Sequence, residues 1–383
     1  MLRLKSGTPP GSEARLVYER YRSSPNGDVF VGSVPHIAGK KLEEIPLHNA
    51  LPQVDFFRGT IYKTLRKEFK ARITHNYECL EQAMINRHFF DHMDTVANGV
   101  YGMSVRLGVP RDEQLTVTLP TRFHDNGYIF GKKEDAFKQG KETHSRHAET
   151  GAVLFVETLE GLIKKGQVTM PDWWTDKHVD MAYAAIRLHS NGSAVSADEQ
   201  ESTPVAALLP GLIDKLDNTH SRVYDSHIQA FSRIPFLKPG HFNRVIQNPL
   251  DILKYKKPAN KHHGKDAQDV FADIERVNHT FQHRIVPKAI THQAAGFERE
   301  TGNVYVQYTA EPAIVGQALA INYTPEQHAN HFDEAYTKSL RTASDIVRII
   351  RRKVFEMESP EGEPVLHVQL QYNDEKPPVT RSY

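Results

Sequence analysis

Apolar residues recur at helical spacing through the middle of the chain. From Leu80 to Leu107 they return every third or fourth position until Gly108 and Pro110 end the run, which predicts a helix with one buried face. Three further segments share this spacing: 146–165, 176–188 and 204–220. Segments rich in Gly, Asn, Pro and Ser separate them and indicate loops. This spacing therefore predicts that residues 69–232 form one helical domain.

The N-terminal segment has a different pattern. Residues 1–68 are rich in Pro, Gly and Ser, and a turn signal at 24–28 separates two short segments of extended character. This pattern predicts an N-terminal arm or hairpin that packs on the main body.

The C-terminal segment mixes helical and strand patterns. Residues 254–265 are basic and polar, which indicates a loop, and 267–289 has the spacing of a helix. Two segments alternate in the manner of strands, namely 304–308 and 365–370. Between them a Thr-Pro pair opens a helix that extends to about residue 355. These patterns predict that residues 233–383 form a helical extension and a small α+β unit. We expect the last ten residues to fray.

Composition narrows the class of protein. The 383 residues carry 48 Lys and Arg against 47 Asp and Glu, so the net charge of +1 creates no overall field that attracts nucleic acid or an acidic membrane. Cys79 is the only cysteine, which excludes a disulfide framework within the chain. The longest apolar stretches are far shorter than the ~20 residues that span a bilayer. No apolar block follows Arg3 and Lys5, so we expect a cytoplasmic protein.

Histidine is the one unusual count, since the chain contains 21 and imidazole is the commonest metal ligand. The strongest local signal is His124 followed by Asp125, just before Asn126 and Gly127. Such a pair offers one neutral nitrogen ligand and one carboxylate that can bridge two ions. The doublet therefore indicates a divalent metal site.

Further candidate ligands lie on the predicted helices around the doublet. His88 and His92 are four residues apart, which places both imidazoles on one helix face. His147 is followed four residues later by Gly151, which leaves room for a neighbouring helix or an ion. Two more candidates end apolar segments: His189 and Asp214. A carboxylate on an apolar helix is costly to bury unless it is paired or bound to metal.

The order of these residues resembles the HD superfamily of metal-dependent phosphohydrolases. The resemblance covers about residues 75–225, in which His124 with Asp125 matches the doublet that names the family. His147 is similar to the family's next histidine, and Asp214 resembles its terminal aspartate. The resemblance implies a mainly α fold, an HD-type helical bundle, with these metal ligands: His88, His92, His124, Asp125, His147, His189 and Asp214. It also implies divalent metal ions, two of them, from among Mn, Fe, Mg, Co and Ni.

The resemblance implies hydrolysis of a phosphoester on a small phosphorylated substrate, with a nucleotide as the expected class. Bound divalent ions would lower the pKa of a water toward neutrality and hold a phosphoryl oxygen for in-line attack. Asp125, Lys215 and Arg122 are the candidate catalytic residues, the last two as positive groups for the phosphate. We expect neither a membrane nor a nucleic acid as partner, and we leave a homodimer open.

Two other functions fit the same order of ligands. An HD-type di-iron oxygenase would use an equivalent set of histidines and aspartates to activate oxygen on a small molecule. A nucleotide-binding regulatory protein would have lost hydrolysis and would use the C-terminal unit for output or dimerisation. The identity of the metal would distinguish the oxygenase from a hydrolase. A tightly bound nucleotide without turnover would indicate the regulatory protein.

The chain departs from the family's pattern after the doublet. Tyr128 stands where many relatives have a lysine that contacts phosphate, and three lysines are candidates to replace it: Lys132, Lys133 and Lys141. Three ligand positions have alternatives: His88 as a surface residue, His144 for His147, and Asp217 for Asp214. We expect Asp217 to cap its helix or to pair with Arg222.

Overall fold

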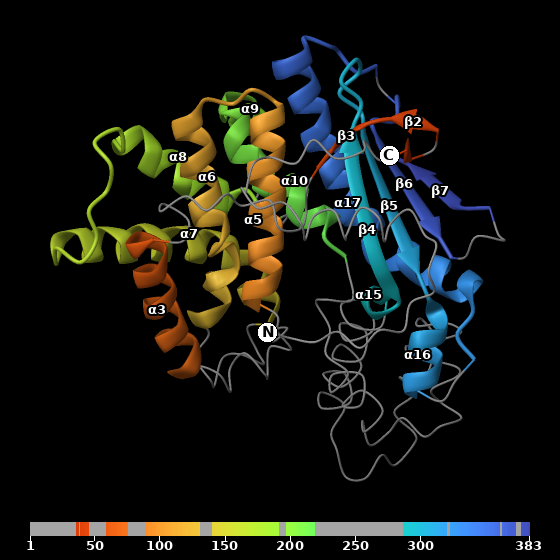
Figure 1. Cartoon of the computed structure of the whole chain (residues 1–383), viewed down its shortest axis with the longest axis horizontal. Coiled ribbons are helices and arrows are strands. Elements are labelled where there is room, and N and C mark those ends of the chain that lie inside the picture. Colours follow the sequence, from red (N-terminus) through yellow and green to blue (C-terminus); the bar gives the residue numbers. More distant parts are fainter. Residues whose placement is uncertain are drawn as a thin grey trace, which may run out of the picture.

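The chain folds into a group of helices beside a mixed sheet, as seen in a computed structural model (Figure 1). The structure describes residues 36–37, 39–45, 59–75, 89–130, 140–190, 197–218, 286–319, 322–360, 362–372 and 377–383. The predicted hairpin at 24–28, the basic segment 254–265 and most of the predicted helix 267–289 lie outside the described residues.

The described chain between residues 59 and 218 is helical. It contains α3 (Thr60–His75), α5 (Phe89–Arg106), α6 (Arg111–Thr121), the 3-10 helix η1 (His124–Phe130), α7 (Gly140–Lys164), α8 (Asp176–Arg187), α9 (Ala197–Ser202) and α10 (Val205–Leu216). Figure 1 shows these helices grouped on one side of the molecule, with the sheet on the other. The prediction of a mainly helical region followed by an α+β unit is confirmed.

The apolar spacing that predicted a helix before residue 108 corresponds to α5. Val96, Val100 and Met103 lie on its buried face. Gly108 adopts a left-handed backbone conformation with φ of 69° just after the helix, which glycine reaches without steric cost. Pro110 then precedes the first residue of α6.

The C-terminal part forms a five-stranded mixed sheet. In spatial order its strands are β3 (Glu43–Glu44), β4 (Ile290–Phe297), β5 (Val304–Ala310), β6 (Leu366–Gln371) and β7 (Val379–Ser382). Neighbouring strands are antiparallel except β5 and β6, which run parallel. A parallel pair needs a long crossover, and α16 (Pro312–Leu319) and α17 (Pro325–Phe355) supply it.

One edge of the sheet differs from the sequence-based expectation. The expectation of a frayed C-terminus is wrong for the described residues near the chain end, because β7 pairs with β6 and the Tyr383 N–H donates to the Leu366 carbonyl at 2.8 Å. At the opposite edge, β3 from the N-terminal segment pairs with β4, after the short hairpin of β1 (His36–Ile37) and β2 (Lys40–Lys41).

Helix α17 lies between the other helices and the sheet (Figure 1). A capping box fixes its start: the Gln327 N–H donates to the Thr324 hydroxyl at 3.3 Å, and the Thr324 N–H donates to the Gln327 side chain at 2.9 Å. The apolar face of α17, which includes Phe332, Leu340 and Val347, is buried in one cluster with residues of α10 and of the sheet. The helical region and the sheet therefore share a hydrophobic core.

His328 of α17 is fully buried and hydrogen-bonded on both ring nitrogens. Because a carbonyl oxygen only accepts, Nε2–H donates to the Val286 carbonyl at 3.1 Å and Nδ1 accepts from the Tyr372 hydroxyl at 3.1 Å. The neutral ring therefore has a hydrogen-bond partner for its one donor and for its one acceptor. Burial, assisted by the neighbouring His331, lowers the pKa of His328 to about 4.

The free energy of unfolding should therefore fall as the pH decreases from about 6.5 to about 4. The unfolded chain takes up a proton on this histidine below about 6.5 while the folded chain does not, a difference of about 3 kcal/mol at the acid end. We expect His328→Gln to lose this contribution to the pH dependence. Urea unfolding of both proteins across this pH range measures it, and parallel losses of stability would contradict the prediction.

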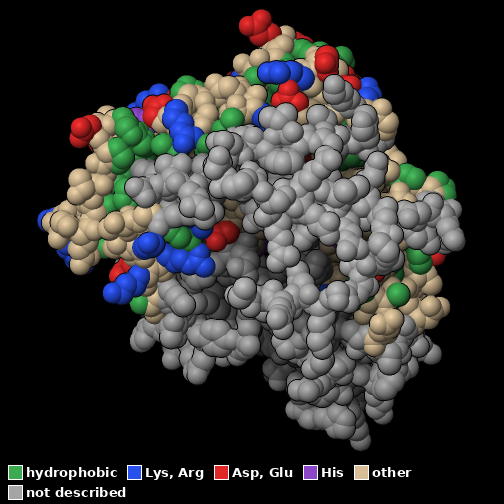
Figure 2. All heavy atoms as spheres, viewed as in Figure 1, with side chains coloured by type: hydrophobic (Ala, Val, Ile, Leu, Met, Phe, Trp, Pro, Cys, Tyr) green, Lys and Arg blue, Asp and Glu red, His purple; other side chains and the backbone are tan. Residues whose placement is uncertain are grey.

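Charged side chains of both signs are interspersed over the described surface seen in Figure 2, in keeping with the net charge of +1. Some join distant elements, as Arg352 of α17 does with Glu201 of α9. Among the helices that the structure describes, none combines the length and the apolar character needed to cross a membrane.

Candidate metal centre

The His-Asp doublet lies where α6 ends and η1 begins. The N–H groups of Arg122 and Phe123 turn back onto the last carbonyls of α6, which tightens the chain into the 3-10 helix. His124 is completely buried, and its Nδ1–H donates to the Thr121 carbonyl at 2.8 Å. This tautomer places the lone pair on Nε2, which has no hydrogen-bond partner among the described residues. A buried acceptor without a partner is costly, and a metal ion would satisfy it.

Asp125 reaches toward both sides of the cluster. Its Oδ2 lies 3.6 Å from His124 Nε2 and 3.8 Å from His92 Nε2. Its Oδ1 lies 3.4 Å from His189 Nε2 and 3.7 Å from His147 Nε2. Each carboxylate oxygen thus faces a different pair of imidazoles, which is the geometry of a carboxylate able to bridge two ions.

Helices α5 and α10 supply the first group of ligand atoms around the doublet. His92 Nε2 lies 3.1 Å from Asp214 Oδ1, and the same oxygen lies 3.7 Å from His124 Nε2. On the opposite side of its ring, His92 Nδ1 lies 2.6 Å from Asp217 Oδ2. Ligand atoms of His92, His124 and Asp214 all lie within 4.8 Å of one another, close enough to hold one ion.

Helices α7 and α8 supply the second group. His147 of α7 and His189, two residues after α8, have their Nε2 atoms 3.0 Å apart. The Nδ1–H of His189 donates to the Ile186 carbonyl, so its Nε2 carries a lone pair. Burial lowers the pKa of His189, which keeps the ring neutral as a metal ligand must be. Ligand atoms of His124, Asp125 and His189 also lie within 4.8 Å of one another.

Both carboxylates of the cluster stay ionised. Burial by itself would raise the pKa of Asp125, but attraction to His124 and contact with His189 outweigh it and lower the pKa. Burial would likewise raise the pKa of Asp214, but the Lys215 ammonium, 2.6 Å from Asp214 Oδ2, is the main cause that holds it well below its usual range. Lys215 also donates to the His189 carbonyl at 2.8 Å, which ties α10 to the end of α8.

Glycines let these elements approach closely enough to form the cluster. A Cβ on Gly127 would lie 1.8 Å from the His147 carbonyl oxygen and 2.7 Å from the Gly151 nitrogen. Helix α7 therefore crosses η1 in direct backbone contact, which is possible because Gly151 of α7 also has no side chain. A Cβ on Gly211 would lie 2.9 Å from the Leu188 carbonyl oxygen, so α10 lies against the end of α8.

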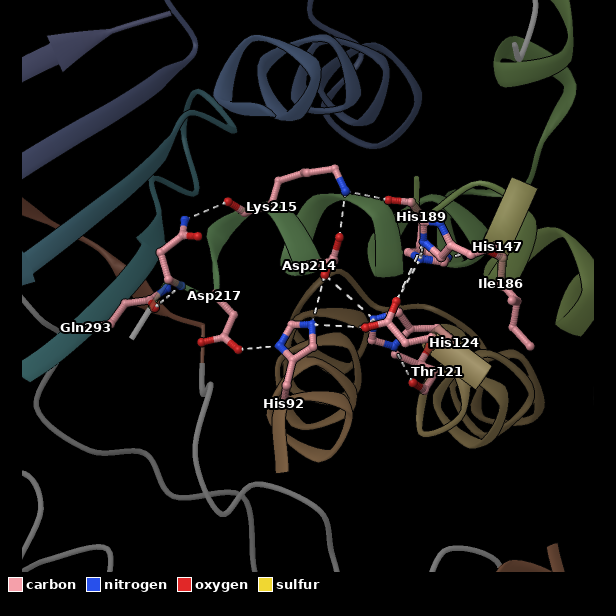
Figure 3. A network of polar contacts seen from close by, with 12 residues as sticks. His92, Thr121, His124, His147, Ile186, His189, Asp214, Lys215, Asp217 and Gln293 are labelled. Carbon is pink, nitrogen blue, oxygen red and sulfur yellow. Dashed lines mark hydrogen bonds and ion pairs between the residues drawn. The ribbon is translucent and has the colours of Figure 1, made fainter. Parts of the chain in front are cut away.

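The structure brings together six of the seven residues expected as ligands: His92, His124, Asp125, His147, His189 and Asp214. Figure 3 labels all of these except Asp125. The seventh, His88, lies outside the described residues, as do Lys132 and Lys133. Of three further residues discussed above the backbone is described but the side chain is not: Tyr128, where the chain departs from the family's lysine, and the alternatives Lys141 and His144.

Arg122 and Lys215, expected to contact phosphate, have partners within the chain. Arg122 is buried, its Nε donates to Asp94 Oδ1 at 2.8 Å, and its guanidinium carbon lies 3.6 Å from the centre of the Tyr62 ring. Lys215 contacts Asp214, a candidate ligand. Their roles toward a phosphate stay predictions.

The sequence indicated Asp217 only as an alternative ligand to Asp214 and gave no sign of its contact with His92. Asp217 is the C-cap residue of α10, as expected, but its carboxylate contacts His92, and Arg222 lies outside the described residues. The available signal was its spacing of three residues from Asp214, which puts the two carboxylates near one helix face.

Two overlapping groups of buried His and Asp side chains could therefore hold metal ions. Comparison of the chain with protein-family models, with curated proteins and with solved structures finds no match.

Proposed function

We propose that this chain is an HD-type metal-dependent phosphohydrolase that acts on a small phosphorylated molecule, with nucleotides as the first class to test. The observation that carries the proposal is the position of Asp125, whose two oxygens face two different pairs of imidazoles. Divalent ions in such a pair of sites would activate a water and polarise a phosphoryl oxygen. The order of ligands along the sequence supports the same family.

Beyond the shared carboxylate, we assign three side chains to the first ion and two to the second. Because the Nδ1 of His124 is engaged with a backbone carbonyl, its single free Nε2 can serve only one ion. The first ion would be held by His92, His124 and Asp214, with Asp125 Oδ2. The second would be held by His147 and His189, with Asp125 Oδ1.

The chain's own residues prepare this site in two ways. Backbone carbonyls fix the tautomers of His124 and His189, so that both Nε2 lone pairs are aimed into the cluster before any ion binds. Lys215 holds Asp214 Oδ2, which leaves Oδ1 as the ligand atom. Three carboxylates and one ammonium, all nearly buried, give the side chains of the cluster excess negative charge. Two divalent ions would reverse this charge in favour of an anionic phosphoryl group.

Phosphoester assays of metal-depleted protein test this function. We expect phosphate release from one class of monoester or diester when Mn, Co, Ni, Mg or Fe is restored, and none in the presence of chelator. His124→Ala should stay inactive with every metal because it removes a ligand of the first ion. The measurement is phosphate release from a panel of nucleotides, cyclic nucleotides, cyclic dinucleotides and simple phosphoesters.

His178→Ala is the matched control, because His178 is a buried histidine paired with Asp112 at 3.1 Å outside the cluster. It should retain turnover. If no phosphoester is cleaved with any metal, hydrolysis is excluded, and oxygen consumption with iron alone would identify the oxygenase instead.

A further inference from the structure

Asp217 is a buried carboxylate that the proposed ligand sets do not use. Its side chain is 1% exposed, and a carboxylate in that position is costly unless it is paired. Its Oδ2 lies 2.6 Å from His92 Nδ1, on the side of the ring away from Asp214. Figure 3 shows the order Gln293, Asp217, His92 and then the cluster.

Carboxylates contact both ring nitrogens of His92, Asp217 at Nδ1 and Asp214 at Nε2. With Nδ1–H donating to Asp217, Nε2 would present its lone pair to an ion held beside Asp214 Oδ1. A carboxylate that accepts from the second nitrogen of a metal-bound histidine orients the ring and makes it a stronger ligand. Asp217 is placed to do both.

The helix fixes only the backbone N–H of Asp217, which donates to the Ile213 carbonyl at 3.1 Å. Helix α10 ends at Leu216, and Asp217 has an extended backbone with φ of −79° and ψ of 98°. Asp214, by contrast, lies within the last turn of the helix. The position of the Asp217 side chain therefore depends also on what fixes the chain immediately after α10.

Two side chains of the sheet hold the residues on either side of Asp217. The amide of Gln293 in β4 donates to the Leu216 carbonyl at 2.5 Å and accepts from the Asn218 N–H at 3.3 Å, so it spans Asp217. The hydroxyl of Tyr308 in β5 donates to the same carbonyl at 2.7 Å and accepts from the Asn218 side chain at 3.3 Å.

Tyr308 is suited to this contact. It is completely buried, and burial raises the pKa of its hydroxyl, which therefore stays protonated as a donor. Both contacts connect residues far apart in sequence, since Gln293 and Tyr308 follow the helical region.

We infer that Asp217 is a positioning residue for the metal ligand His92, and that Gln293 and Tyr308 hold it there, which makes the C-terminal sheet part of the metal centre's outer shell. The inference rests on the proposed metal site, but not on the reaction. It gives the sheet a role in metal affinity although the candidate ligands all lie in helices or directly beside them.

Metal affinity of the full-length chain tests the inference without any substrate. Competition between the metal-free protein and a chromophoric chelator for Co²⁺ gives the affinities, and the Co²⁺ absorption spectrum reports the ligand geometry. We expect Asp217→Asn and Gln293→Leu each to weaken one of two bound ions by about 10- to 100-fold. Because both act through one pathway, the double variant should be little weaker than either single variant.

Gln307→Leu is the matched control. Gln307 is the neighbour of Tyr308 in β5 and therefore points to the opposite face of the sheet. It should bind both ions as the wild type does. Urea unfolding of the metal-free proteins separates positioning from general loss of structure, and if Asp217→Asn fails to fold, Gln293→Leu still decides the question.

Wild-type affinity and spectrum in Gln293→Leu, or in a folded Asp217→Asn, would overturn the inference. Equal weakening by Gln307→Leu would overturn it too, because the effect would then belong to the sheet in general. Tight metal binding without phosphoester cleavage would refute the proposed reaction alone, whereas a wild-type chain that binds no divalent ion refutes both.

Discussion

Replacing Asp125 with alanine is expected to abolish metal-dependent turnover, with a loss of at least about a thousandfold. Asp125 is the carboxylate that faces all four imidazoles of the cluster. Its removal takes one ligand from each ion and leaves less negative charge to balance the bound cations. Metal ions supply several kcal/mol of charge stabilisation in such reactions, and each 1.36 kcal/mol is a factor of ten in rate. The measurement is turnover on the substrate found in the phosphoester panel, at saturating metal.

Asp112→Ala provides the control for this change. Asp112 is also a carboxylate that contacts a buried histidine, His178, but that pair lies at the start of α6 and α8. This variant should keep wild-type turnover within a few fold. An Asp125→Ala protein that turns over like Asp112→Ala would show that the doublet is not part of the active site.

Among the proposed variants, Gly127→Ala is expected to lower the free energy of unfolding most, by about 3 kcal/mol or more. The added methyl group would meet the His147 carbonyl at 1.8 Å, and the atoms in its way belong to the backbone of α7. Side chains cannot move aside to relieve this clash, so the cost is at the upper end of that for overpacking. Separation of η1 from α7 would also move the doublet away from His147, so metal binding should weaken. Urea unfolding and Co²⁺ titration measure the two effects.

Gly161→Ala in α7 makes the same chemical change where nothing lies within 4 Å of the new methyl group. Alanine favours a helix over glycine by up to about 1 kcal/mol, so this variant should be as stable as the wild type or slightly more stable. Similar unfolding midpoints for the two variants would disprove the close crossing of η1 and α7.

The sequence predicted those helices and strands whose apolar residues recur at a regular spacing. The buried positions of α5 recur at helical spacing, and Val304, Val306 and Tyr308 alternate as β5 requires. Strand β4 was missed because its sequence, ITHQAAGF, combines small and polar residues with no alternation. Strand β7 was missed because what orders it is pairing with β6, and a short polar segment does not reveal a distant partner.

In the candidate site, too, the sequence predicted local features but not contacts between distant segments. The order of His and Asp residues suggested which side chains meet, because each ends a helix or lies on a helix face. The contact of Asp217 with His92 joins the residue after α10 to a residue of α5, and Gln293 and Tyr308 of the sheet contact the residues on either side of Asp217. No spacing in the sequence encodes such contacts, since they arise only when α10 packs against both α5 and the sheet.

The number of divalent ions that the chain holds tests the central claim most directly. Metal-free protein is dialysed against Mn²⁺, and bound metal is counted by elemental analysis beside the His124→Ala, Asp125→Ala double variant. We predict two tightly bound ions in the wild type, because two overlapping ligand groups could hold metal ions, and neither in the variant. A wild-type chain that retains no more metal than the variant would contradict the metal centre.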